Sequence, residues 1–104
     1  MPQKIINAII YRNDSQLKLV NLLTEKETDC RYPLLMQFNE GAPIAETSIA
    51  LVTIADDGGI TCHAGVHLYD KNDAKLTVKK LPLDEIISIS YKAAMNYQKM
   101  SLGA

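Results

Sequence analysis

The four residues Asp56-Asp57-Gly58-Gly59 constrain the fold more than any other feature, because they separate two apolar runs. Asp-Gly and Gly-Gly pairs favour the tight turn of a β-hairpin, whose central residues need positive φ angles. The run before the turn, residues 49–55, is typical of a buried strand. It is too short for a transmembrane helix, which needs about 20 consecutive apolar residues. We therefore predict an antiparallel hairpin formed by residues 49–55 and 60–69.

Side chains alternate regularly along the second strand of this hairpin. Because neighbouring strand residues point to opposite faces, two sets are expected on opposite sides of the sheet. The first set is expected to face the core and consists of Ile60, Cys62, Ala64, Val66 and Leu68. The second set is expected to face solvent and consists of Thr61, His63, Gly65, His67 and Tyr69.

Further strands are predicted on both sides of this hairpin. Residues 4–11 are apolar on both faces, which is typical of a strand buried on both sides. Residues 12–15 are turn formers, and residues 16–23 are interpreted as a strand that forms a hairpin with residues 4–11. A helix over 16–23 is the alternative, but its leucines would scatter around a helical wheel. Three further expectations are a polar connection at 24–31, a strand at 32–38 and a second hairpin in which 75–81 pairs back after the turn at 70–73.

The C-terminal segment, residues 84–101, has the pattern of an amphipathic helix with Asp84 as N-cap. A narrow polar stripe contains Glu85, Ser88, Lys92, Asn96 and Lys99. The remaining arc is broad and apolar, and includes Ile86, Ile87, Ile89, Ala93, Ala94 and Tyr97. A strand over residues 86–91 is the competing interpretation, since Ile-Ser-Ile alternates.

These elements predict one α+β domain over residues 1–104. Its expected architecture is an antiparallel β-sheet or partly open barrel built from hairpins, with the C-terminal amphipathic helix packed on it.

Composition excludes several classes of protein. The chain is 47% hydrophobic and 22% charged with a net charge of −1, which argues against intrinsic disorder. Nucleic-acid binding is disfavoured, because 11 Lys and Arg balance 12 Asp and Glu and only one Phe and no Trp are available for stacking. No membrane span or secretory signal is predicted. Cys30 and Cys62 are interpreted as reduced, buried thiols of a cytoplasmic protein.

Motifs for catalysis and metal binding are weak. Cys62 and His63 are expected on opposite faces of a strand, so they do not form a local nucleophile–base pair. His63 and His67 would lie roughly 13 Å apart on a strand, too far to bind one metal ion. We therefore expect no cofactor, no metal and no enzymatic activity.

The first functional hypothesis is a non-enzymatic protein–protein interaction module: an adaptor, regulator or inhibitor with an unidentified protein partner. It is expected to self-associate as a homo-dimer or larger homo-oligomer. Tyr91, Met95 and Met100 are the candidate interface residues, because they lie near the edge of the apolar arc and because Tyr and Met are favoured at interfaces. The alternative is a small-molecule site on the polar strand face, with His63, His67 and Tyr69 beside Thr61. A third hypothesis is a small enzyme that uses a histidine with a carboxylate.

Overall fold

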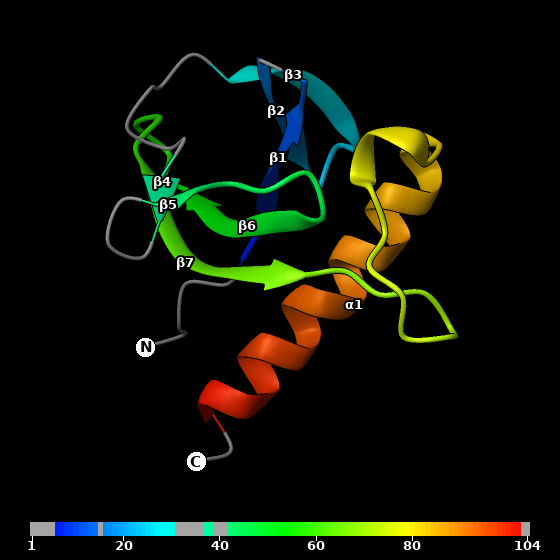
Figure 1. Cartoon of the computed structure of the whole chain (residues 1–104). Helices are drawn as coiled ribbons and strands as arrows, with labels where there is room; N and C mark the ends of the chain where they lie inside the picture. Colours follow the sequence, from blue (N-terminus) through cyan, green and yellow to red (C-terminus); the bar gives the residue numbers. More distant parts are fainter. Residues whose placement is uncertain (1–5, 15, 31–36, 39–41, 103–104) are drawn as a thin grey trace.

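The computed structural model describes residues 6–14, 16–30, 37–38 and 42–102, which form an open antiparallel sheet and one long helix (Figure 1). Within these residues the sheet has five strands in the order β3-β2-β1-β6-β7. The sheet strands are β1 (Ala8–Asn13), β2 (Gln16–Asn21), β3 (Lys26–Cys30), β6 (Ser48–Ile54) and β7 (Ile60–His67). The other elements are the short hairpin β4 (Gln37–Phe38) and β5 (Ala42–Pro43), the 3₁₀ turn η2 (Val78–Lys80) and the helix α1 (Leu83–Leu102). The α+β class is confirmed, and the sheet is open.

Strand β1 lies at the centre of the sheet and is buried on both faces, as its sequence predicts. On the face toward α1, Ile9 and Tyr11 join a core that includes Val20, Leu22, Ile49, Leu51, Ile86 and Ala94. On the opposite face, Ala8 and Ile10 join a second cluster with Leu17, Ile44, Ala50 and Val52. The sheet therefore separates two apolar layers.

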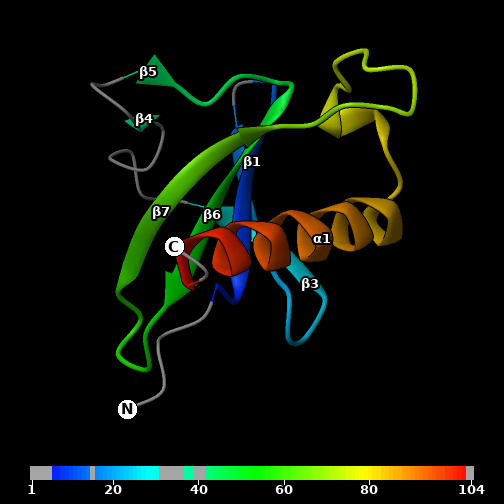
Figure 2. The same ribbon diagram turned by 90° about the horizontal axis from the view of Figure 1, so that it is seen from below.

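Helix α1 lies across one face of the sheet (Figure 2). Ile86, Ile87 and Ala94 are buried there, and the predicted polar stripe is exposed. The helix begins one residue earlier than predicted. The N–H groups of Glu85 and Ile86 donate to the carbonyl oxygen of Pro82, each at 3.0 Å, so Asp84 lies inside the first turn and is not the N-cap. Its negative charge there still favours the helix, because helix N-termini carry partial positive charge.

Two sequence predictions about connections are wrong. Residues 26–30 form the edge strand β3, not a polar connection, because the backbone pairs with β2 even though the side chains are charged. Residues 75–81 do not pair back as a strand; a single bridge joins Tyr69 and Lys75. The chain then turns inward, and the N–H of Val78 donates to the carbonyl oxygen of Glu46 at 3.0 Å. This places the buried Val78 side chain in the core beneath the helix.

Other predictions about strands have mixed outcomes. The hairpins β1–β2 and β6–β7 are confirmed. Of the strand expected at 32–38, only the last two residues belong to the described part of the chain, as β4.

The Asn7 side chain extends the pairing between β1 and β6 by one position. Its Nδ2 donates to the carbonyl oxygen of Ile54 at 3.1 Å, and its Oδ1 accepts from the Ile54 N–H at 2.8 Å. The backbone N–H of Asn7 also donates to Val52, and its carbonyl accepts from Leu22. One half-buried residue therefore connects three strands near the start of β1.

A β-bulge at His63 divides β7 into two parts that face different layers. Ala64 pairs with Leu51 while Cys62 pairs with the next residue, Val52, so His63 is the extra residue between them. As a result, Ile60 packs in the cluster away from α1, whereas Val66 packs in the core beneath α1. The single core face predicted for alternate residues from 60 to 68 is therefore wrong.

The cysteines also differ from the expectation of two buried thiols. Both are free, as predicted, but Cys62 is exposed and Cys30 is only half-buried. Partial desolvation nevertheless raises the pKa of the Cys62 thiol.

Candidate functional site

The most prominent candidate site is an exposed apolar surface beside helix α1. Among the described residues, five large hydrophobic side chains are exposed, and three of them are Leu23, Tyr91 and Met95, with exposed fractions of 70%, 38% and 67%. Leu23 lies in the turn between β2 and β3, which runs beside the helix in both views (Figures 1 and 2). We call Leu23, Tyr91 and Met95 the α1 patch.

Tyr91 joins the two parts of the α1 patch. Its hydroxyl donates to the backbone carbonyl oxygen of Leu22, in the turn that carries Leu23. The Leu22 side chain is buried in the core, which fixes the turn against the sheet. The tyrosine ring is thus held across the gap between the helix and the turn, with little rotational freedom left to lose when a partner binds.

Met95 extends the α1 patch along the helix. It lies four residues after Tyr91, and residues at this spacing are neighbours on a helix surface. A methionine side chain adapts its shape to different apolar partners. Met100, the third predicted interface residue, belongs to α1, but its side chain lies outside the described part of the structure.

The residues of the alternative ligand site do not share one face. His63 Nε2 lies 2.7 Å from Thr53 Oγ1, whereas His67 Nδ1 lies 2.7 Å from Ser48 Oγ. Ser48 and Thr53 are an odd number of residues apart on the regular strand β6, so they point to opposite faces of the sheet. The bulge therefore places His63 on the α1 side and His67 on the other side.

Each histidine lies near one other residue of the predicted ligand site: Thr61 for His63, and Tyr69 for His67. Thr61 pairs with Thr53, so it lies on the face of His63. Tyr69 is exposed, and its ring meets that of His67 in an edge-to-face arrangement with the centroids 6.5 Å apart. The four residues thus form two separate pairs.

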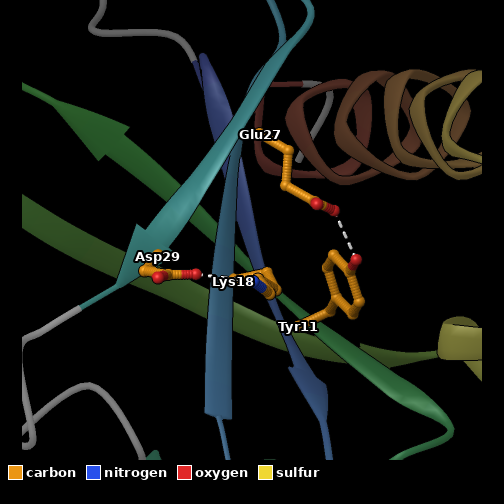
Figure 3. A network of polar contacts seen from close by, with 4 residues as sticks. All are labelled: Tyr11, Lys18, Glu27 and Asp29. Carbon is orange, nitrogen blue, oxygen red and sulfur yellow. Dashed lines mark hydrogen bonds and ion pairs between the residues drawn. The ribbon is translucent and has the colours of Figure 1, made fainter.

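A polar network on the α1 side of the sheet was missed from the sequence (Figure 3). The Tyr11 hydroxyl donates to Glu27, and Lys18 Nζ donates to Asp29 Oδ1 at 2.5 Å. Burial is the main reason that the pKa of Tyr11 is raised above its ordinary value, and the hydrogen bond and charge of Glu27 add to the effect. Both pairs link the charged edge strand β3 to strands further into the sheet, Glu27 to Tyr11 in β1 and Asp29 to Lys18 in β2. The network depends on the pairing of β3 with β2, which places Glu27 and Asp29 on the same face as Tyr11 and Lys18.

A second ionic contact lies near the β1–β2 turn. Lys79, in η2, contacts Asp14, and its Nζ lies 3.8 Å from Glu46 Oε1. Asp14 is exposed, so these contacts contribute little to stability. They lie where η2 passes the end of β1.

Metal and membrane sites are not found in the described part of the chain. No group of three or more His, Cys, Asp or Glu residues there could hold a metal ion. No helix among these residues is long and apolar enough to cross a membrane.

Comparison with protein-family models, curated proteins and solved structures gave no match for this chain.

Proposed function

We propose that this protein is a non-enzymatic interaction module that binds another protein chain through the α1 patch. The observation that carries the proposal is the exposure of Leu23, Tyr91 and Met95 together with the hydrogen bond from Tyr91 to the turn that carries Leu23. A cytoplasmic location is part of the proposal and is supported by the free thiols of Cys30 and Cys62.

Leaving these exposed apolar side chains in water costs free energy, which a partner that covers them recovers. Each Å² of apolar surface that a partner removes from water is favourable by roughly 25 cal/mol, and the loss of freedom on association offsets part of this gain. Tyrosine contributes a rigid ring with one polar end, and methionine contributes an adaptable apolar chain, which is why both are enriched at interfaces. In the monomer, by contrast, α1 already buries Ile86, Ile87 and Ala94 against the sheet, so the exposed Met95 is not needed to hold the helix in place.

The two other hypotheses have less support. A small-molecule site on one strand face needs His63 and His67 together, and the bulge separates them. An enzyme that uses a histidine with a carboxylate needs such a pair in contact. In the described part of the chain, the ring nitrogens of both histidines instead contact hydroxyl groups, those of Thr53, Ser48 and Thr47.

The proposal is tested by comparing Met95→Glu with wild type in affinity capture from nuclease-treated lysate of the source cells. The tag is placed at the N-terminus, so that α1 is free. We expect Met95→Glu to lose the captured partner while keeping the wild-type unfolding temperature, because the Met95 side chain is exposed. Gln16→Glu is the matched control: it adds the same charge at an exposed position at the opposite end of β2 from Leu23. Equal capture by all three proteins would contradict the proposal.

A further inference from the structure

Charged and apolar residues follow a definite order along the exposed face of α1. Asp84 and Glu85 lie in the first turn, Tyr91 and Met95 lie near the middle, and Lys99 lies in the last turn. All five side chains are exposed. At a rise of 1.5 Å per residue, Asp84 and Lys99 are each about 11 Å from a point between residues 91 and 92. The face is therefore acidic at one end and basic at the other, and in the middle the exposed apolar side chains of Tyr91 and Met95 lie beside the exposed Lys92.

We propose that the α1 patch is covered by a second copy of this chain, with the two α1 helices antiparallel around a two-fold axis that passes between residues 91 and 92. This inference rests on the proposed function and names its partner. In the antiparallel pair, Asp84 faces Lys99 of the partner subunit, and the same contact repeats on the other side of the axis. Tyr91 and Met95 of both copies meet in the middle, where they exclude water from one another.

Charge decides the direction of the helices. A parallel arrangement would bring the two acidic first turns together and the two Lys99 residues together, and like charges across an interface are repulsive. The antiparallel arrangement replaces both repulsions with attractions and also aligns the helix macrodipoles favourably. Lys92 lies beside the axis and meets its own copy in either arrangement, so its repulsion opposes both directions equally. Because the net charge of the chain is only −1, long-range repulsion between two copies is small.

The size of the contact predicts a weak dimer. A specific, stable interface buries roughly 800 Å² on each partner. A 20-residue helix is about 30 Å long and about 10 Å wide, so one helix face with the neighbouring turn supplies less than that area. We therefore expect a dimer that dissociates on dilution.

The same order of charges also stabilises a single helix, since acidic residues favour its N-terminus and basic residues its C-terminus. An experiment with two charge-reversed variants separates the two roles. Asp84→Lys alone places basic groups at both ends of the face, and Lys99→Glu alone places acidic groups at both ends. Each variant should repel itself. A mixture of the two should form a heterodimer, because Lys99 of the first variant then meets Asp84 of the second and both introduced charges also find opposite partners.

Sedimentation velocity on the purified full chain, from micromolar to millimolar concentration and at low salt, provides the measurement. We expect wild type to dimerise and each single variant to dimerise about tenfold more weakly, since two ion pairs become two repulsions. An equimolar mixture should recover the wild-type dimer. Far-UV circular dichroism of each variant checks that α1 is intact. A role confined to one helix predicts no recovery on mixing, because the macrodipole of each chain stays uncompensated.

Three outcomes would overturn the inference in distinguishable ways. A wild-type chain that stays monomeric at every concentration would refute the second copy. The proposed function would survive if Met95→Glu still loses a captured partner of another kind. A dimer whose single variants and mixture behave like wild type would refute the antiparallel arrangement. A dimer that is unaffected by Met95→Glu would place the interface away from the α1 patch, and the proposed function would then depend on capture alone.

Discussion

Replacing Asn7 tests whether one side-chain amide acts as a piece of backbone at the start of β1. The Asn7 amide both donates to and accepts from the backbone of Ile54, at 3.1 and 2.8 Å, which is what a paired strand residue would do. Asn7→Ala removes both hydrogen bonds. Asn7→Asp keeps the shape of the side chain and the acceptor for the Ile54 N–H, but it replaces the donor with a carboxylate oxygen that faces the Ile54 carbonyl.

The expected magnitude follows from these two bonds. A typical intramolecular hydrogen bond contributes about 1 kcal/mol net, so Asn7→Ala should lower the free energy of unfolding by about 2 kcal/mol. For a chain of this size that corresponds to a fall in melting temperature of roughly 10 °C. At neutral pH, Asn7→Asp should cost at least as much, because its carboxylate repels the Ile54 carbonyl oxygen.

The pH dependence of Asn7→Asp gives a second, independent check. Protonation restores a donor that can bond to the Ile54 carbonyl, so the folded state raises the pKa of the introduced carboxyl group above the ordinary value of about 3.9. A raised pKa means that the folded state binds the proton more tightly than the unfolded state does. The variant should therefore gain stability relative to Asn7→Ala as the pH falls.

Urea unfolding of wild type and both variants, followed by circular dichroism, measures these free energies. The titrations run from neutral pH down through the pKa of the introduced carboxyl group. If Asn7→Ala costs less than about 0.5 kcal/mol, the amide does not contribute as two hydrogen bonds. If Asn7→Asp is as stable as wild type at neutral pH, the donor to Ile54 is unimportant and the reasoning is refuted.

Two further predictions concern buried polar groups. The Ser90 hydroxyl is fully buried and has no hydrogen-bond partner among the described residues. Ser90→Ala should therefore raise the free energy of unfolding by about 1 kcal/mol, measured by urea titration. A loss of stability would show that the hydroxyl has a partner. The raised pKa of Tyr11 means that the unfolded state loses its phenolic proton first, so stability is full below about pH 10 and falls above it. Tyr11→Phe should flatten this alkaline fall in unfolding experiments. A fall equally steep in Tyr11→Phe would contradict the assignment.

Local patterns were sufficient for the elements that hydrophobic periodicity and turn residues define. Asp-Gly and Gly-Gly at 56–59 correctly predicted the β6–β7 hairpin, and Gly58 has the positive φ angle of 90° that such a turn requires. The apolar arc of residues 84–101 correctly predicted the helix and most of its buried residues. In both cases the information lies within one segment of the chain.

Features that depend on distant residues could not be predicted in this way. The strand β3 has a polar sequence and exists because the backbone of β2 is available for pairing. The bulge in β7 shifts the register against β6, and nothing within residues 60–68 marks His63 as the extra residue. For the candidate site, the sequence predicted Tyr91 and Met95, which are exposed, and their role as an interface stays a prediction; the exposed Leu23 was missed. Its place in the α1 patch follows from a hydrogen bond between residues that are 69 positions apart.

Because of the bulge at His63, the number of residues in β7 matters as much as their identity, since it decides which apolar layer each half of the strand faces. Deleting one residue there would restore strict alternation, and either the segment 60–62 or the segment 64–67 would have to exchange one apolar layer for the other. Insertions or deletions in the turn at residues 56–59, by contrast, would leave both strands facing the same layers as before. A designer who grafts a new loop onto the β6–β7 hairpin therefore has freedom at 56–59 and none at position 63. The count of residues between the turn and Leu68 is the quantity to preserve.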